Sequence, residues 1–181
     1  MTLNLARPAG ESWRPLDRDC VAALEASARA GAEAIADFLR ASRPGFEASR
    51  IAEHPLRLGI RETRRALGLV VLGADDVLDG VRRDDEVAVS TWPIELWQSQ
   101  KRASLSYPLA PCSVPLGALV SRTHPRLGLA GRCMSATHEA LGALRVIGTS
   151  LATGEAIGRA AALAVDAGVA LGAIAPARVR E

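Results

Sequence analysis

The chain has 181 residues, enough for one domain of ordinary size or two small lobes. Hydrophobic residues make up 49% of it and aromatic residues only 3%, so its core must consist mainly of Ala, Leu, Val and Ile. The 22 basic and 20 acidic residues leave a net charge of +2, which is too balanced to indicate a nucleic-acid partner.

The cysteines, Cys20, Cys112 and Cys133, are widely spaced and include no CxxC pair. This spacing argues against a disulfide framework, a structural zinc site or a self-contained iron–sulfur cluster. We therefore expect reduced cysteines, no metal and a cytoplasmic protein. The N-terminus lacks the long apolar stretch of a secretory signal, and the most apolar segment, residues 160–174, is too short to span a bilayer. We expect no membrane association.

The predicted elements begin with a strand at residues 2–6 that alternates polar and apolar side chains and ends in the turn at residues 7–10. A long helix should start after Asp17, a suitable N-cap, because apolar residues follow it at helical spacing. Pro44 and Gly45 should end this helix.

The middle of the chain predicts short strands separated by turns. Alternating apolar residues favour a strand at residues 56–60, and apolar runs favour strands at residues 69–72 and 86–92. A short helix should follow Gly73, because Asp75 and Asp76 suit a helix N-terminus. Residues 97–115 should be loop-like, since three prolines interrupt regular pairing.

The last third predicts a ligand-binding arrangement. A short strand at residues 127–130 leads into a tight turn at Gly131, then a polar loop at residues 134–144, then a long helix that ends near Asp166. Gly154 and Gly158 give this helix a side-chain-poor face, which should lie close to a sheet or a cofactor, although a plain packed Ala-rich helix is the alternative. The free N–H groups and the dipole at such a helix start suit an electron-rich ligand.

Two sequence blocks resemble one family. Residues 58–65 (LGIRETRR) and 73–78 (GADDVL) resemble the "IGxREsRR…G…L…eDV" block of a family of FAD-dependent oxidoreductases. Residues 129–140 (LAGRCMSATHEA) resemble its second block, "AGRCiSaTHEA", in the right order. The resemblance implies an α/β fold with antiparallel content, FAD as cofactor, and hydride transfer from a small organic substrate to FAD.

A wider likeness suggests roles for single residues. Residues 145–151 (RVIGTSL) resemble the RxxGxSL element of succinate dehydrogenase and fumarate reductase flavoproteins. It implies that His138 and Arg145 face the substrate. Arg61 and Arg64, in the first block, are weaker substrate candidates. The residues implied to lie at the flavin are Gly131, Arg132, Gly148, Thr149, Ser150 and Leu151.

Structural alternatives stay open for these side chains. His138 could bond a loop carbonyl, and Arg145 could pair with Glu139 or Glu155. The arginines of residues 61–65 could form a solvated or Glu62-paired face, and Cys133 could be a small buried hydrophobe.

No GxGxxG turn, the pattern that binds the ADP pyrophosphate in full-length members, occurs in the chain. We therefore expect a C-terminal portion of such an enzyme, with residues 1–125 on the substrate side and residues 126–181 from the FAD-binding domain. It would be inactive alone, and would need a separate N-terminal FAD-binding chain or self-association. The alternatives are a non-catalytic subunit and the inert remnant of a truncated gene.

Overall fold

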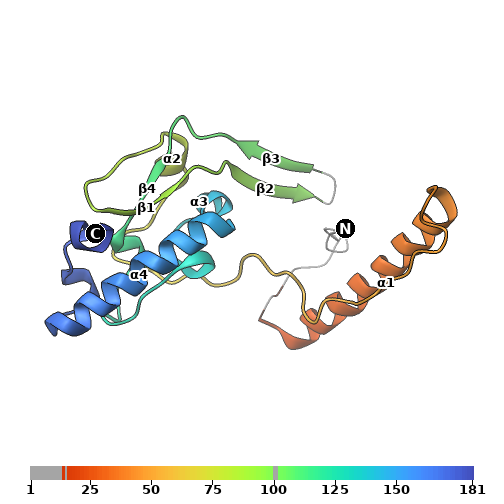
Figure 1. Cartoon of the computed structure of the whole chain (residues 1–181), viewed down its shortest axis with the longest axis horizontal. Helices are drawn as coiled ribbons and strands as arrows, with labels where there is room; N and C mark the ends of the chain where they lie inside the picture. The colour runs from red at the N-terminus through yellow and green to blue at the C-terminus, as the bar shows by residue number, and fades with distance from the viewer. Residues whose placement is uncertain (1–13, 15, 100–101) are drawn as a thin grey trace. The chain divides into compact units, whose positions relative to one another are not determined.

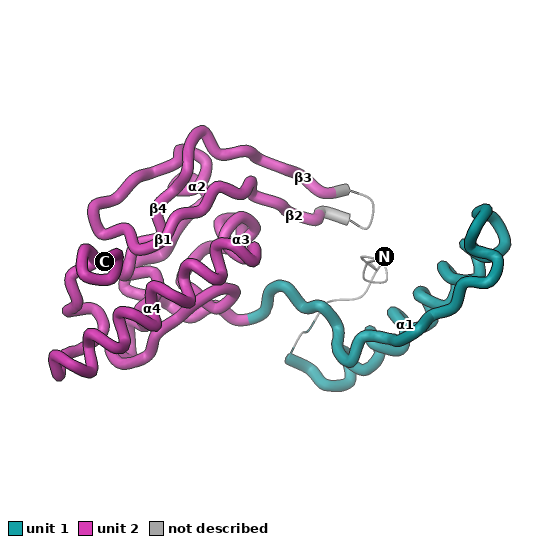
Figure 2. Tube along the Cα trace, viewed as in Figure 1, with its two compact units in different colours: residues 1–63, 99–101 teal, residues 64–98, 102–181 magenta. Residues whose placement is uncertain are grey.

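A computed structural model describes residue 14, residues 16–99 and residues 102–181. The described residues form the expected mixed α/β structure of helices and small sheets (Figure 1). The predicted strand at residues 2–6 lies outside them. The chain divides into unit 1, residues 1–63 and 99–101, and unit 2, residues 64–98 and 102–181 (Figure 2). The functional boundary expected after residue 125 stays a prediction.

Unit 1 is built on the predicted long helix, α1 (Arg18–Ser42), and the chain that runs back beside it. The Asp17 carboxylate caps α1, since its Oδ1 accepts from the N–H groups of Asp19 (3.0 Å) and Cys20 (3.1 Å). The bond from Cys20 is the main reason that the pKa of Asp17 lies below its ordinary value. The helix ends before Gly45, which has a φ of 88°. No residue of α1 is buried, so this helix contributes no buried core to unit 1.

Unit 2 contains the core. Strands β1 (Glu86–Ser90) and β4 (Cys112–Pro115) pair antiparallel, with Ser90 opposite Cys112 and an irregularity between Glu86 and Ala88. Strands β2 (Ile94–Ser99) and β3 (Arg102–Ser106) form a second pair. Helices α2 (Ala74–Leu78) and α3 (His138–Leu144) pack on each other, and α2 also contacts β4.

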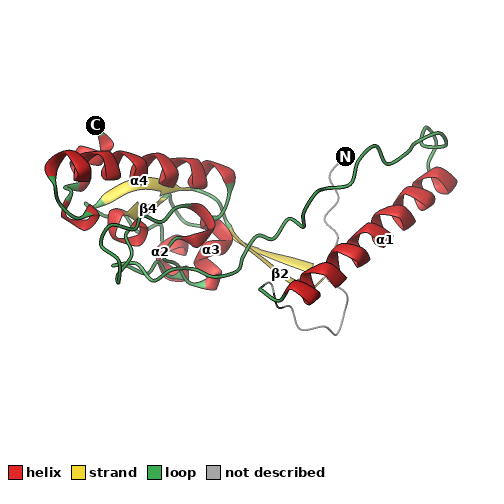
Figure 3. Cartoon of the chain, turned by 90° about the horizontal axis from the view of Figure 1, so that it is seen from below, coloured by secondary structure: helices red, strands yellow, loops and turns green. Residues whose placement is uncertain are grey.

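The long C-terminal helix, α4 (Ile147–Ala167), covers β1 together with the short helix α5 (Pro176–Arg180). Figure 3 shows α4 lying along the strand pair. Single turns of tighter helix occupy Leu116–Leu119, Gly131–Cys133 and Leu171–Ala173. The largest fully buried side chains between these elements include Leu72, Leu119, Met134, Leu141 and Leu144.

Three predicted strands are wrong, each for lack of a continuous partner. Residues 56–60 form no strand, and the N–H of Ile60 bonds to the carbonyl of Leu58 (2.9 Å). Residues 69–72 are as apolar and ordered as a strand, but their N–H groups bond to different segments. Leu69 donates to Val120, Val70 to Gly117 and Leu72 to Ser135, which leaves only isolated bridges. The segment at residues 127–130 likewise makes only the bridge from Gly128 to Val120.

For the other predicted elements, the type agrees with the structure more often than the first and last residues do. The strand expected at residues 86–92 ends at Ser90, and the short helix is present as α2, with the Asp76 carboxylate accepting from the N–H of Gly73 (2.8 Å). The expected loop at residues 97–115 is wrong in part, because it includes the end of β2 and all of β3 and β4. Its prolines lie between or at the ends of these strands, where no ladder N–H is lost.

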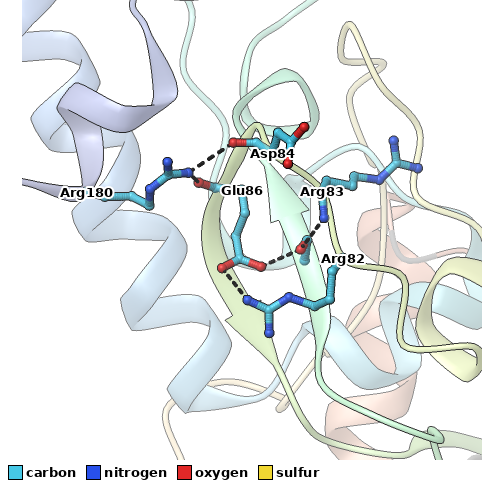
Figure 4. Close-up of polar contacts among 6 residues, drawn as sticks. Arg82, Arg83, Asp84, Glu86 and Arg180 are labelled. Atoms are coloured by element: carbon cyan, nitrogen blue, oxygen red, sulfur yellow. Dashed lines mark hydrogen bonds and ion pairs between the residues drawn. The ribbon is translucent and has the colours of Figure 1, made fainter.

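A polar cluster connects α5 to the start of β1 (Figure 4). The Arg180 guanidinium donates through Nη1 to the carbonyl oxygens of Asp84 (3.2 Å) and Glu86 (2.6 Å). The Glu86 carboxylate in turn pairs with Arg82 (2.7 Å) and accepts from the Ser113 hydroxyl of β4. One arginine near the chain end thus bonds directly to the backbone that starts β1.

Replacing Arg180 by Ala should loosen α5 and the start of β1. Exposed bonds to a charged donor contribute about 1 kcal/mol, so amide exchange in residues 84–90 and 176–180 should accelerate about fivefold. The matched control is Arg178→Ala on the same helix, because Arg178 has only a 3.8 Å exposed contact to Glu181. Hydrogen–deuterium exchange decides it, and equal exchange in both variants would contradict the anchoring role.

Candidate functional site

The N-terminus of α4 is open. Its N-cap, Val146, offers no side-chain acceptor, so the N–H groups of the first turn have neither an intrahelical nor a capping partner from that residue. Ile147 is 80% exposed, and a Cβ built on Gly148 would meet no atom within 4 Å. The helix dipole adds a partial positive charge at the same place. This end of α4 can accept an electron-rich group without a steric obstacle from the described residues.

The turn at Gly131 lies directly against this helix start. Gly131 has a φ of 57°, and its N–H donates to the Thr153 hydroxyl of α4 (3.2 Å). A Cβ on Gly131 would lie 3.3 Å from the Ser150 Oγ. Glycine therefore serves both the backbone conformation and the close approach. Two backbone segments far apart in the sequence meet here.

The six residues predicted to lie at the flavin belong to the two segments of this junction, and those of α4 lie on different sides of the helix. Gly131 and Arg132 lie on the turn, and the other four begin α4. Thr149 points inward, where its hydroxyl donates to Ser90 on β1 (3.3 Å), while Leu151 is 70% exposed on the outward side. The side chain of Ser150 donates a long hydrogen bond to the Arg145 carbonyl (3.5 Å).

Arg145 is the C-cap of α3, two residues before α4 begins at Ile147. Its Nη2 donates to the backbone carbonyl of Glu95 on β2 (3.4 Å). Of the two carboxylates suggested as ion-pair partners, Glu155 instead pairs with Arg159 (3.0 Å). The guanidinium therefore connects the corner between the two helices to the β2 strand.

His138 begins α3 and is exposed. Arg145 lies seven positions further along the chain, which corresponds to roughly 10 Å along a helix axis. The polar loop predicted here is wrong in part, because Thr137 caps a helix by accepting from the N–H of Ala140 (3.3 Å). Thr137, followed by apolar residues at helical spacing, was a readable signal for this helix.

Charges also gather at the start of α3. The pKa of Glu139 lies below its ordinary value, first because its own backbone N–H donates to the carboxylate and then because the Thr137 hydroxyl does so. The positive charges of His138 and Arg65 act in the same direction. The stabilisation is present above the unfolded pKa and is lost as the pH falls through the lowered pKa.

The basic residues at positions 61–65 are divided between the two units. Arg61 belongs to unit 1 and Arg64 to unit 2, and both residues are exposed. The neighbouring Arg65 is the one whose charge reaches Glu139, and the N–H of Ala66 bonds to the carbonyl of Cys133 (3.1 Å). Sequence reasoning ranked Arg61 and Arg64 as substrate candidates and missed that Arg65 lies beside α3.

Gly154 and Gly158 were expected to face a sheet or a cofactor; the sheet is wrong for the described residues, and the cofactor stays a prediction. A Cβ on either would meet nothing within 4 Å, so neither lets α4 approach a sheet of the described residues. The face that packs inward carries Thr149, Thr153, Ala156, Ala160 and Ala164. The opposite face, which we call the outward stripe, is exposed and apolar; it consists of Ile147, Leu151, Gly154, Gly158, Ala162 and Val165.

The outward stripe continues into a concave region at the C-terminal end of α4. A pocket of about 320 Å³ is lined there by apolar residues and Arg126. Val165, 80% exposed, belongs to both the stripe and the pocket wall. A helix that is apolar on both faces is typical of one covered on both sides.

No described helix is long and apolar enough to cross a membrane. Among the described residues, no three His, Cys, Asp or Glu side chains gather in a way that could hold a metal ion. Cys133, expected to be buried, is exposed beside the Gly131 turn, where its Sγ donates to the Ala130 carbonyl (3.1 Å). Cys112 is buried, and burial is the main cause that raises the pKa of its thiol.

The cysteines should therefore react in a fixed order. At neutral pH an aromatic disulfide reagent should label Cys133 first, and should reach Cys112 only after urea unfolding, because Cys112 is inaccessible and its thiolate is disfavoured. Because Cys20 is also partly exposed, the comparison uses a Cys20→Ser background, in which Cys133→Ser should remove the fast phase and Cys112→Ser should leave it intact. Fast labelling of Cys112 in the native chain would contradict this packing.

Comparison with known proteins places the chain. The model of the family described as FAD dependent oxidoreductase matches residues 5–181. Neither a curated protein nor a solved structure matches the chain.

Proposed function

Because the chain belongs to the FAD-dependent oxidoreductase family, we propose that it supplies the flavin-ring end of an FAD site. The single observation that carries the proposal is the uncapped, exposed start of α4 beside the Gly131 turn. Bound FAD would accept a hydride from a small organic substrate. The ADP end of the cofactor would be held by a chain that carries a GxGxxG turn, a pattern that these 181 residues do not contain.

The residues at the junction fit a flavin in their donor chemistry. Backbone N–H groups at Ile147 and Gly148 would hold the edge of the ring on which negative charge develops when the flavin accepts electrons. The absence of a side chain at Gly148 leaves room for a planar ring to approach the helix end. Arg132 on the Gly131 turn and Ser150 in the first turns of α4 would orient the ring with their side chains.

Arg145 is proposed to bind a substrate carboxylate or the flavin edge from the corner between α3 and α4. Its bond to the Glu95 carbonyl would fix the direction of the guanidinium. His138, at the other end of α3, would serve as a proton relay or orient the substrate. Since α3 keeps the two side chains apart, they would contact different parts of the substrate.

The outward stripe supports a partner. Its members at the two ends, Ile147 and Val165, are each 80% exposed, and Leu151 between them is 70% exposed. We commit to the GxGxxG-bearing chain as the occupant, because the stripe starts at the proposed flavin end and the missing phosphate-binding turn must reach the same cofactor. Small residues at Gly154 and Gly158 would let this chain lie close to the α4 backbone.

Two alternatives remain distinguishable. A non-catalytic subunit would complete the site of a separate chain without supplying reacting groups, whereas an inert remnant would bind neither partner nor flavin. A reading frame for a GxGxxG chain beside this gene would favour a split enzyme, and its absence would favour a remnant.

The first test is association. Alone, the chain should purify with little FAD. Together with the GxGxxG-bearing N-terminal segment of a full-length family member, it should form a complex that retains FAD through gel filtration. Val165→Asp should weaken this association about 30-fold or more, roughly 2 kcal/mol, because a carboxylate would be buried without a partner.

The matched control is Leu109→Asp, since Leu109 is an equally exposed aliphatic residue (85%) outside α4. It should leave association unchanged. A homodimer that Val165→Asp dissociates, without any complex with the GxGxxG chain, would assign the stripe to a second copy. Stoichiometric FAD in the chain alone would overturn the split-site proposal.

The second test addresses Arg145. In the reconstituted complex, on an organic acid that it oxidises, Arg145→Ala should lower turnover about 10²-fold, since a charged contact made mainly in the transition state is lost. Arg178→Ala is the control. Rates are measured with an artificial electron acceptor and normalised to bound flavin. Equal turnover in the two variants would contradict the active-site role of Arg145.

A further inference from the structure

The Thr153 hydroxyl lies between the two backbone segments of the junction. Thr153 is completely buried on the inward face of α4. Its Oγ1 accepts from the N–H of Gly131 at 3.2 Å. The same hydroxyl donates back into its own helix, to the carbonyls of Thr149 (2.9 Å) and Ser150 (3.1 Å).

This geometry uses the hydroxyl as both donor and acceptor. The single hydroxyl proton is shared by two carbonyls of the first helical turns, which leaves a lone pair directed at Gly131. Because the site is buried, no solvent replaces this acceptor if the hydroxyl is removed. The distance between the turn and the helix start is therefore set by one side chain.

Gly131 shows how closely the two segments are matched. It has a positive φ, and a side chain here would place its Cβ 3.3 Å from the Ser150 Oγ, so glycine allows the turn to lie this close to the helix. The Thr153 bond opposes a shift of the turn away from the helix.

We propose that Thr153 is a positioning residue for the flavin, acting through the Gly131 turn. The inference rests on the proposed function, because the turn and the first turn of α4 are the segments assigned there to the cofactor. Thr153 itself would not touch FAD. Its hydroxyl would hold the Gly131–Cys133 turn at the distance from Gly148 and Ser150 that a bound ring requires.

Three variants separate this role from simple stability. Thr153→Val keeps the shape and loses the hydroxyl, and Thr153→Ser restores it. Ser90→Ala removes the other hydroxyl contact of the inward face of α4, the 3.3 Å bond from Thr149, without touching Gly131. In the chain alone, the Gly131 amide should exchange about tenfold faster in Thr153→Val only, as measured by NMR.

In the complex with the GxGxxG-bearing segment, Thr153→Val should bind FAD about tenfold more weakly and shift the flavin absorbance bands, while Thr153→Ser and Ser90→Ala keep the wild-type values. Flavin bound equally by Thr153→Val and wild type would overturn this inference alone. So would an unchanged Gly131 exchange rate. A wild-type complex without flavin would overturn the proposed function and this inference with it.

Discussion

The structure depends on the packing of α4, which is apolar on two opposite faces. The inward face, built from small residues such as Ala156 and Ala160, lies against β1 and closes the core of unit 2. The outward stripe is equally apolar but exposed. Burial of apolar area is favourable by about 25 cal/mol per Å², so a helix of this composition gains stability from cover on both sides. The inward face is covered and the outward stripe is not, which is why a partner is proposed for the outward stripe.

The same packing fixes the start of α4. Thr149 and Thr153 face inward and connect the first turns of the helix to β1 and to the Gly131 turn. Gly148, before Thr149, and Leu151, between the two threonines, are exposed on the other side of the helix.

Arg145 and Glu95 show how the β2–β3 pair is tied to this end of α4. The guanidinium bond to the Glu95 backbone joins the helix corner to β2, and Gly142 of α3 lies against the same segment, where an added Cβ would come within 3.0 Å of the Glu95 carbonyl oxygen. The hairpin therefore lies beside the candidate site through backbone contacts, which tolerate changes in its side chains.

Sequence patterns predicted the parts that depend on local chemistry. The Asp17 cap, the helix at Ala74–Leu78 and the long α4 helix each follow from a capping residue or an apolar period near them in the chain. The run at residues 69–72 misled because a strand needs a continuous partner, and its partners here lie in two separate segments, at residues 117–120 and at Ser135. The glycines at 154 and 158 misled for a related reason. A glycine-spaced face indicates close approach, but the sequence does not tell whether the approaching surface belongs to the same chain.

The Gly131 turn and the helix start were predicted from the residue pattern and the family resemblance, but the bond that joins them was not. The motif identified Gly131 and Ser150, whereas Thr153 and Arg65 gained their significance from contacts across long sequence separations. Such contacts leave no periodic signal. The family match over residues 5–181 confirms the resemblance to FAD-dependent oxidoreductases. The likeness to succinate dehydrogenase and fumarate reductase flavoproteins, and the role of each residue, stay predictions.

The most direct measurement is a crystal structure of the chain bound to a GxGxxG-bearing segment and FAD. We expect the segment to cover the outward stripe at Leu151, Gly154, Gly158 and Val165. We expect the flavin edge to lie at the N–H groups of Ile147 and Gly148. A complex in which α4 keeps its outward face exposed, or in which the flavin lies away from this helix end, would contradict this expectation.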